Sequence, residues 1–192
     1  MTEAERITTF LNDIHPLDQE DMDELLRECR EVDFPRNILI TREGQIERYL
    51  YFVLEGIQRS YYIKDEKEYV IAFTYTDEFS GLPESLLTQR PARYNLATIT
   101  QSRMLRIPYE HLAWCADAYH GVERLLRIAT GEVLDGFIHR HYELLALSME
   151  ERFVAFMQRS GHLIHQIPHK YIASYLGMDP TNFSKLLHSV PY

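Results

Sequence analysis

Polar and cationic side chains recur at short spacing near the C-terminal end of the sequence, between Ile167 and Leu187 and just beyond. Short hydroxyl and amide groups can hydrogen-bond to the edges of DNA bases, and lysine and histidine can contact phosphate oxygens. The residues that carry these groups are His169, Lys170, Thr181, Asn182, Ser184, Lys185 and His188. Together they predict binding of double-stranded DNA, with Thr181, Asn182 and Lys185 at base edges or nearby phosphates.

Two short helices joined by a tight turn are expected to hold these side chains. Gly177 permits a left-handed residue in the turn, Asp179 is suited to cap the second helix, and Pro180 fits its first position. The expected apolar positions are Ile172, Ala173, Leu176, Phe183, Leu186 and Leu187. This layout is typical of a helix-turn-helix, whose second helix reads DNA; a generic helical hairpin is the alternative.

Short runs rich in β-branched and aromatic residues occupy the region from 33 to 107, and polar or glycine breaks separate them. The runs are 38–40, 49–54, 57–63, 69–75, 94–99 and 104–107. Many short strands at close spacing predict a sandwich, barrel or jelly roll. A metalloenzyme of the cupin type would need inward histidines, but no histidine lies between His15 and His111. The sequence therefore does not indicate an enzyme.

Helices are predicted on both sides of the strands, over residues 5–31 with a break at Pro16, over 110–118, and as one long helix over 121–147. The long helix has two apolar stripes, and each stripe needs a surface that shields it from water. We expect the roll to cover one and a second copy of the chain to cover the other, as in a coiled coil. The residues predicted at this dimer interface are Val122, Leu126, Ala129, Val133 and Phe137; the neighbouring stripe comprises Leu125, Ile128, Leu134, Ile138 and Leu145. One broad face on a single core is the alternative.

A hinge is expected near residues 147–148. Ser148 and Glu151 match a capping box, in which the hydroxyl and the glutamate each bond a backbone N–H at the start of a helix. Gly161 is expected to end that helix, and residues 162–167 are expected to form a short, extended link.

The composition is that of a globular chain: 192 residues, 45% hydrophobic and 26% charged, with a net charge of −9. The charge is uneven, because residues 1–147 carry a net −10 and residues 148–192 a net +1. No apolar run approaches the ~18 residues that span a bilayer, and the N-terminus lacks a signal-peptide core. These features predict a cytoplasmic protein without a membrane partner.

No metal site and no cofactor is predicted. His165 and His169 have helical spacing, but Pro168 disfavours a single helix across them. Cys29 and Cys115 are far apart in the sequence and are interpreted as small buried hydrophobic residues.

Three motifs resemble the Crp/Fnr family of bacterial transcription regulators. The segment from Tyr49 to Gly56 resembles the family's strand–turn signature, and the segment from Thr76 to Gly81 resembles the lead into its phosphate cassette. Ile172-Ala173-x-x-Leu176-Gly177 is similar to the family's helix-turn-helix hallmark, and residues 170–177 are similar to the branch common in Bacteroidetes-type regulators.

The resemblance implies an α+β fold with three parts. An N-terminal double-stranded β-roll (jelly roll) with flanking helices is expected at 1–120 as a cyclic nucleotide-binding-like sensor. A long dimerisation helix is expected at 121–147, and a C-terminal helix-turn-helix DNA-binding domain at 148–192.

The resemblance also implies a ligand site in the roll, where the family binds a cyclic nucleotide through a Gly-Glu pair and an Arg-Ser/Thr pair. The implied ligand-binding residues are Gly81, Glu84, Arg93, Tyr94 and Asn95, with Arg90 as the second candidate for the phosphate arginine. Leu82 stands in the place of the family's glutamate, and the apolar pair Phe137-Ile138 stands where a polar pair reads adenine. A cyclic nucleotide, a different small molecule and an unliganded regulator therefore all stay open, and Arg93 is equally interpreted as a surface charge.

The function that follows from the resemblance is a homodimeric regulator that binds DNA, contacts RNA polymerase and responds to a small-molecule effector through the hinge. The alternative is a dimeric small-molecule-binding or interaction module without sequence-specific DNA binding. The acidic total charge favours the alternative. So does the expected absence or reduction of the family's wing, a strand pair after the second helix, because Val190-Pro191 closely precedes Tyr192.

Overall fold

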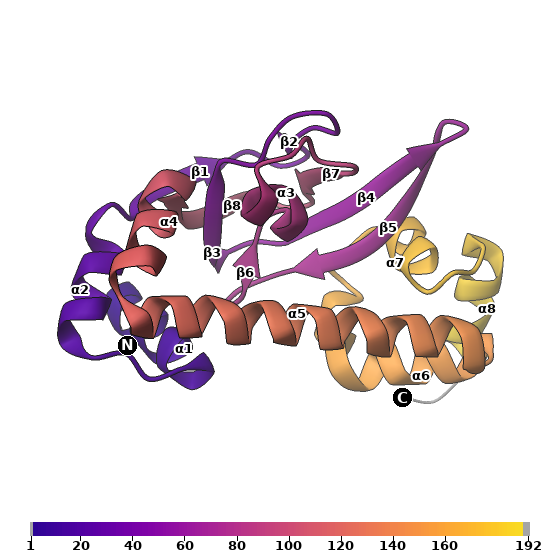
Figure 1. The fold of residues 1–192 in the computed structure, drawn as a ribbon. Helices are drawn as coiled ribbons and strands as arrows, with labels where there is room; N and C mark the ends of the chain where they lie inside the picture. The colour runs from indigo at the N-terminus through magenta and orange to yellow at the C-terminus, as the bar shows by residue number, and fades with distance from the viewer. Residues whose placement is uncertain (1, 190–192) are drawn as a thin grey trace. The chain divides into compact units, whose positions relative to one another are not determined.

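The computed structural model describes residues 2–189 (Figure 1). Its elements in chain order are α1 (Glu3–Ile14), α2 (Gln19–Arg27), β1 (Arg30–Phe34), β2 (Leu39–Thr41), β3 (Tyr49–Glu55), β4 (Gln58–Lys64), β5 (Lys67–Thr74), β6 (Phe79–Ser80), α3 (Pro83–Thr88), β7 (Asn95–Thr98), β8 (Ser102–Pro108), α4 (Tyr109–Ala118), α5 (His120–Ala146), α6 (Met149–Ser160), the 3₁₀ turn η1 (Gly161–Leu163), α7 (His169–Tyr175) and α8 (Pro180–Ser189).

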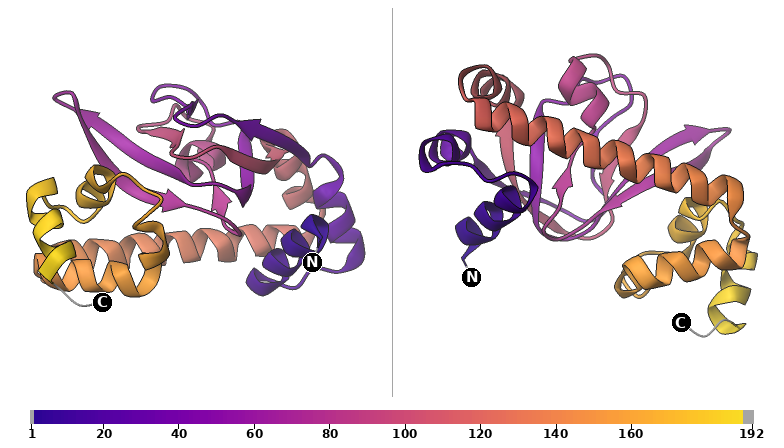
Figure 2. Two further views of the ribbon diagram at one scale, coloured as in Figure 1. Left: turned by 180° about the vertical axis from the view of Figure 1, so that it is seen from behind. Right: turned by 60° about the horizontal axis from the view of Figure 1, so that its bottom comes forward.

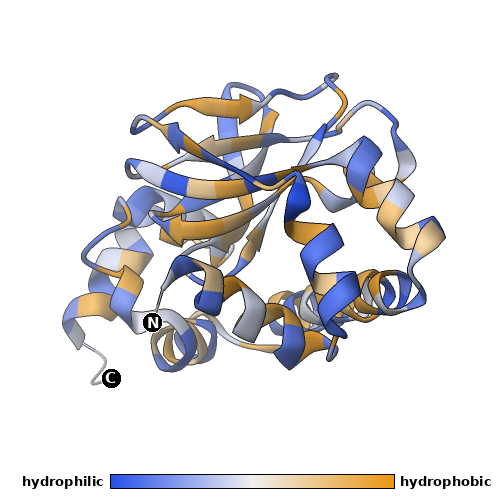
Figure 3. Cartoon of the chain, turned by 90° about the vertical axis from the view of Figure 1, so that its left-hand side faces the viewer, coloured by the Kyte–Doolittle hydropathy of each residue, from blue (hydrophilic) through white to orange (hydrophobic). Residues whose placement is uncertain are grey.

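The strands form two four-stranded sheets with the orders β1-β8-β3-β6 and β2-β7-β4-β5. In the first sheet β8 pairs antiparallel with both β1 and β3, and Phe52 lies opposite Leu105. Hydrophobic and hydrophilic residues both occur in the strands (Figure 3), and in β3 the consecutive residues Tyr51, Phe52, Val53 and Leu54 are all buried, so both faces of this strand are covered. Gly56 after β3 has φ +100°, and a Cβ there would lie 2.4 Å from Ser102 Oγ, so this turn requires glycine.

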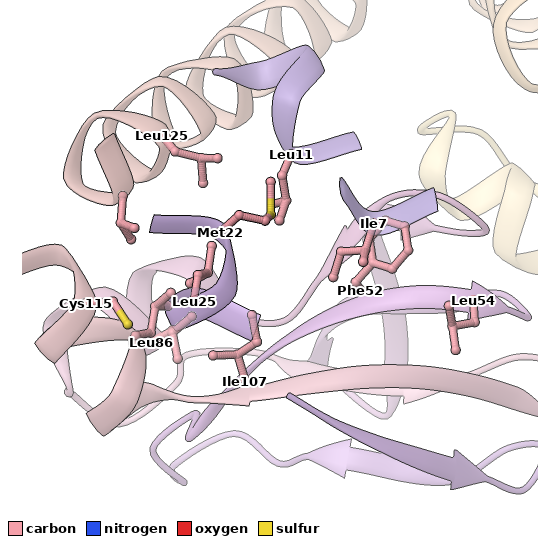
Figure 4. Close-up of a cluster of buried hydrophobic side chains, with 12 residues drawn as sticks. Ile7, Leu11, Met22, Leu25, Phe52, Leu54, Leu86, Ile107, Cys115 and Leu125 are labelled. Atoms are coloured by element: carbon pink, nitrogen blue, oxygen red, sulfur yellow. The ribbon is translucent and has the colours of Figure 1, made fainter. Parts of the chain in front are cut away.

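The chain divides into two compact units, residues 1–60 with 73–133, and residues 61–72 with 134–192. In the first unit, the N-terminal helices, α4 and the start of α5 pack on one face of the first sheet (Figure 4). The buried residues of this cluster are Ile7, Leu11, Met22, Leu25, Phe52, Leu54, Leu86, Ile107, Leu112, Cys115, Val122 and Leu125. Burial of each large side chain of this kind contributes about 1.5–3 kcal/mol relative to leaving it in water.

The second unit gathers α6, α7 and α8 around the C-terminal part of α5 (Figure 2). Phe153 of α6 and Phe183 of α8 are fully buried, and their ring centroids lie 5.7 Å apart. The tip of the β4–β5 hairpin belongs to this unit, and Tyr61 and Val70 are buried in it.

Several expectations differ from these boundaries. The strands β1 and β6 and the helix α3 were not predicted from the pattern of residues, because each is short or largely polar. The extended link expected at 162–167 is wrong: the chain coils there, since Ile164 and Ile167 donate backbone hydrogen bonds to Gly161 and Leu163. The expected domains were 1–120, 121–147 and 148–192. The compact units instead divide the long helix after residue 133, and they place residues 61–72 at the tip of the hairpin in the C-terminal unit.

Other expectations agree with the described residues. The capping box of Ser148 and Glu151 is present, and Gly161 caps the end of α6. The predicted stop at Val190-Pro191 lies outside the described residues. No helix of residues 2–189 combines the length and the apolar character that crossing a membrane requires.

Candidate functional site

The two helices α7 and α8 and the turn between them form a reading head, the name used here for residues 169–189. Gly177 in the turn has φ +65°, and its amide is bonded to the carbonyl of Ser174. Asp179 caps α8, because its Oδ1 accepts from the backbone N–H groups of Thr181 and Asn182, each at 2.9 Å. The turn and the cap follow the sequence prediction and give α8 a fixed starting point.

Six of the seven side chains predicted to bind DNA are exposed: His169, Lys170, Thr181, Ser184, Lys185 and His188. Asn182 is half-buried, and its Nδ2 donates to Asp179 Oδ2 at 2.5 Å. The His169 ring contacts the buried ring of Phe183, with centroids 5.3 Å apart. Asn182 would therefore have to exchange a bond within the cap for a bond to a base.

A buried ionic cluster joins the reading head to the helices that carry it. Glu143 of α5, 1% exposed, accepts from Arg140 of the same helix at 2.7 Å and from Arg159 of α6 at 2.9 Å. Arg140 also donates to the carbonyl of Tyr175 in α7, and its guanidinium lies 4.2 Å from the centroid of that tyrosine ring. These four residues, called the ionic node below, connect α5, α6 and α7.

The ionic node sets the charge state of its carboxylate. Burial by itself would raise the pKa of Glu143, but the hydrogen bonds and positive charges of Arg159 and Arg140 outweigh it and lower the pKa below its ordinary value. Glu143 is therefore ionised at neutral pH. A buried carboxylate of this kind is stable only while its cationic partners are in place.

A serine hydroxyl fixes α7 to the tip of the β4–β5 hairpin. Ser174 Oγ accepts from the N–H of Val70 and donates to the carbonyl of Glu68, both at 3.0 Å. The strand β5 is the edge of its sheet, so the hydroxyl takes the place of a neighbouring strand for these two backbone groups. Both partners belong to the second unit, whereas the other end of the hairpin belongs to the first.

The second candidate site is the segment 81–95 with α3, called the cassette below. Glu47 is buried beside it and accepts from Thr41 Oγ1 at 2.8 Å, while its backbone N–H donates to Ser85 Oγ at 3.0 Å. Burial raises the pKa of Glu47, hydrogen bonds from Thr41 and the backbone lower it in part, and the nearby charge of Glu84 raises it further. The inner side of the cassette therefore carries carboxylates.

The sequence-predicted ligand residues divide into two groups. Tyr94 and Asn95 are buried and Glu84 is half-buried; the Tyr94 hydroxyl donates to Glu84 Oε2 at 2.7 Å. Glu84 Oε1 and Asn95 Nδ2 are buried without a hydrogen-bond partner among the residues that the structure describes. Arg93 is exposed, and Gly81 has φ +143°.

This donor set does not match the one that a cyclic phosphate needs. Leu82 is fully buried where the resemblance implies a ribose-binding glutamate, and Arg90 and Arg93 are both exposed. An anionic phosphate beside the cassette would meet the carboxylates of Glu47 and Glu84, and neither Arg90 nor Arg93 is buried there to offset their charge. The residues of the cassette therefore do not fit a cyclic nucleotide held as the resemblance implies.

The expected dimer face requires a correction. Val122 is fully buried in the core of the first unit, and Leu126 packs partly against the same core, so the dimer face cannot include the Val122 side chain. Val133 and Phe137 are 42% and 40% exposed, and Ala129 is half-buried. The neighbouring stripe is more open: the most exposed apolar residues of α5 are Leu134 at 59%, Ile138 at 60% and Leu145 at 74%.

Sequence reasoning did not find the ionic node or the role of Ser174. Arginine and glutamate three residues apart on a helix usually indicate a solvated face, and a serine in a short helix carries no signal of its own. The one available hint was position, because Arg140 and Glu143 lie on the side of α5 away from Leu134 and Ile138.

Part of the chain matches a known protein family. Residues 31–119 match the family described as cyclic nucleotide-binding domain. A comparison with curated proteins gives no match.

Several solved structures share the fold. FixK2 from Bradyrhizobium japonicum has a TM-score of 0.77 and 20% identity, covering 84% of this chain and 84% of that one. The c-di-GMP-responsive global regulator CLP of Xanthomonas campestris has a TM-score of 0.66 and 20% identity, covering 90% and 91%. The catabolite activator protein of Thermus thermophilus has a TM-score of 0.58 and 20% identity, covering 94% and 86%. The predicted fold class and the resemblance to Crp/Fnr regulators are thereby confirmed.

The ionic node predicts a pH-dependent stability. Glu143→Gln should lower the free energy of unfolding at neutral pH by about 3 kcal/mol, because it leaves two arginines without their carboxylate. Since the folded pKa of Glu143 lies below its ordinary value of 4.5, the wild-type advantage should be present above that value and vanish as the pH falls through the folded pKa. Urea unfolding across this range measures it. Glu150→Gln, an exposed position on α6, is the matched control, and an equal loss in both variants would contradict the assignment.

The serine contact predicts a local loss of protection. Ser174→Ala removes the acceptor of the Val70 N–H, so hydrogen exchange of that amide should become about tenfold faster, as expected for a loss of about 1.4 kcal/mol. Exchange followed by NMR measures it. Ser184→Ala, exposed on α8, should leave Val70 unchanged; unaltered exchange in Ser174→Ala would show that the hairpin tip is held by other contacts.

Proposed function

We propose that this protein is a homodimeric, DNA-binding transcription regulator, because residues 31–119 match the cyclic nucleotide-binding domain family and most of the chain shares the fold of FixK2 and of a regulator titled as one of the Crp/Fnr family. The observation that carries the proposal is the exposed polar face of the capped helix α8, with Thr181, Ser184 and Lys185 on a buried Phe183 anchor. The role is regulatory rather than catalytic, in keeping with the regulators and activator that the similar structures are titled as.

The reading head is suited to base contacts more than to strong phosphate binding. Its lysines are Lys170 and Lys185, and the remaining groups of the face are hydroxyls, an amide and imidazoles. Phosphate contacts dominate the affinity of most DNA-binding proteins and its salt dependence. We therefore expect the affinity for DNA to depend only weakly on salt concentration. Hydroxyl contacts to base edges would supply the sequence specificity.

Dimerisation would occur through the second half of α5. Leu134, Ile138 and Leu145 are spaced by four and seven residues, lie on one helical face, and are at least 59% exposed. Pairing of this stripe with a second copy would bury it as a coiled-coil seam. Two reading heads would then address successive major-groove faces about 34 Å apart on a near-palindromic site.

A signal in the roll has a physical route to the reading head. The β4–β5 hairpin starts and ends in the first unit, and Ser174 bonds its tip to α7. An effector shifts the equilibrium between two arrangements only by binding one of them better. The orphan Glu84 Oε1 and Asn95 Nδ2 favour an effector that offers a hydrogen-bond donor and an acceptor. As a transcription regulator, the protein would also contact RNA polymerase.

Selection from a pool of random DNA duplexes, followed by gel-shift analysis, tests the proposal. An enriched, near-palindromic sequence supports it. No enrichment would instead favour the alternative, a small-molecule-binding or interaction module without sequence-specific DNA binding. The net charge of −9 is consistent with that alternative.

Lys185 is expected to contribute one phosphate contact in each copy. Lys185→Ala should weaken binding to the selected site and lower the slope of log affinity against log salt by about 2 for a dimer. Titrations at several salt concentrations measure the slope. Arg36→Ala removes an exposed cation from the first unit and should leave the slope unchanged; the same slope in all three proteins would remove Lys185 from the interface.

The stripe on α5 predicts a variant that is folded but monomeric. Ile138→Glu should weaken the dimer about a hundredfold or more, because each copy loses an apolar contact of about 1.5–3 kcal/mol and gains a charge in the seam. Sedimentation equilibrium measures the dissociation constant. Ala146→Glu places the same charge at an exposed position off the stripe and should retain the dimer; a monomeric wild type would refute the interface.

A further inference from the structure

A second cluster of chemically reactive side chains lies in the first unit, outside the cassette and the reading head. Glu24 projects from α2, and His111 and Cys115 project from α4, with one ligand atom of each within 4.8 Å of the others. Cys115 is fully buried, and His111 is 9% exposed. The spacing of four residues places the imidazole and the thiol on one face of α4, toward α2.

The three donors are the set that a borderline transition metal takes: imidazole nitrogen, sulfur and carboxylate oxygen. Cys115 Sγ lies 3.5 Å from His111 Nε2. A tetrahedral zinc ion with Zn–S near 2.3 Å and Zn–N near 2.0–2.1 Å holds its sulfur and nitrogen ligands about 3.6 Å apart. We propose that Glu24, His111 and Cys115 bind a single divalent transition-metal ion of the zinc class.

The present contacts of the cluster identify what an ion would have to replace. His111 Nε2 lies 2.8 Å from the backbone carbonyl of Glu24, so the ring must release this bond and present Nε2 without a proton. Arg27 Nη2 lies 2.9 Å from Glu24 Oε1, but its side chain is 57% exposed and can turn toward solvent. Glu24 Oε1 is buried and lacks a hydrogen bond of good geometry, so the ion pair with Arg27 leaves it incompletely satisfied.

The thiol of Cys115 is held in its protonated, unreactive form when no ion is bound. Burial raises the pKa of Cys115 to about 11; the charges of Glu24 and Asp21 act in the same direction, and Arg27 opposes them. The thiol is thus protonated in the metal-free protein, and a bound metal would displace its proton. Reactivity toward oxidants is correspondingly low, which suits a ligand better than a redox switch.

An ion at this cluster would add a further link between two helices that already meet through apolar contacts, the His111 bond and the contact of Arg27 with the Trp114 ring. Three protein ligands would leave a fourth coordination position for water or a small ligand. Because α4 ends at Ala118, directly before α5, the ion would fix the segment from which the long helix starts.

Cobalt titration of the reduced, untagged, metal-stripped full chain tests the site. We expect one equivalent of Co²⁺ to bind with a thiolate-to-cobalt charge-transfer band and the ligand-field bands of tetrahedral coordination, and Zn²⁺ to displace it. Trp114, the single tryptophan, stacks on His111 with ring centroids 5.9 Å apart, so Co²⁺ should quench its fluorescence with the same midpoint.

Variants assign the ligands. Cys115→Ala should abolish the charge-transfer band, whereas Cys29→Ala, at the other cysteine, should retain it. Glu24→Gln, which conserves shape, should weaken the affinity about tenfold or more, and Glu28→Gln on the turn after α2 should not. Circular dichroism establishes that each variant is folded.

Three results would overturn the proposal. The first is a wild-type chain without the charge-transfer band, including one that binds cobalt through surface histidines alone. The second is a band that Cys29→Ala removes and Cys115→Ala retains. The third is an unchanged affinity in a folded Glu24→Gln variant.

Discussion

The C-terminal half of the molecule depends on one buried carboxylate between two arginines. Glu143 is nearly inaccessible to solvent, and its ionised form is stable there only because Arg140 and Arg159 each supply a charged hydrogen bond. Removal of one partner from a buried ion pair lowers the free energy of unfolding by more than the intact pair contributes to it. The cluster therefore favours the one alignment of α5 and α6 in which all three side chains meet. Through the bond from Arg140 to the carbonyl of Tyr175, the same constraint extends to α7 and fixes where α8 can point.

The helix-turn-helix could be predicted from the sequence because its determinants are local. Gly177 is needed for a positive φ and Asp179 for the first free N–H groups of α8, and both requirements act within a few residues. Most of the strands were predictable for a similar reason, since runs of β-branched and aromatic residues and the breaks between them act at short range. The bonds that join separate elements are those from Arg159 to Glu143, from Ser174 to the carbonyl of Glu68 and between His111 and the carbonyl of Glu24. They connect residues 16 to 106 positions apart, and no short-range pattern contains them.

The long helix α5 shows that an apolar pattern does not by itself determine which surface covers it. Both apolar stripes of α5 are present in the sequence, but the pattern does not say which core each one meets. The N-terminal turns of the helix are covered by the first unit, which buries Val122 and Leu125 together. From Val133 onward that cover ends, and the polar side of the helix turns inward because the ionic node requires it. The exposed stripe is therefore set by the position of Glu143 as much as by the apolar residues themselves.

The cassette illustrates why a shared domain does not imply a shared ligand. A β-roll supplies a protected space and a short helix, but the charge of the side chains that face inward decides what can enter. Here the side chains include Glu47, whose pKa is raised by burial, and Glu84, while Arg90 and Arg93 are exposed. A phosphate beside Glu47 and Glu84 would add negative charge beside carboxylates, whereas a hydrogen-bond donor could satisfy Glu84 Oε1 and an acceptor could satisfy Asn95 Nδ2. The residues of the cassette, rather than the fold, therefore decide which chemical groups this region can bind.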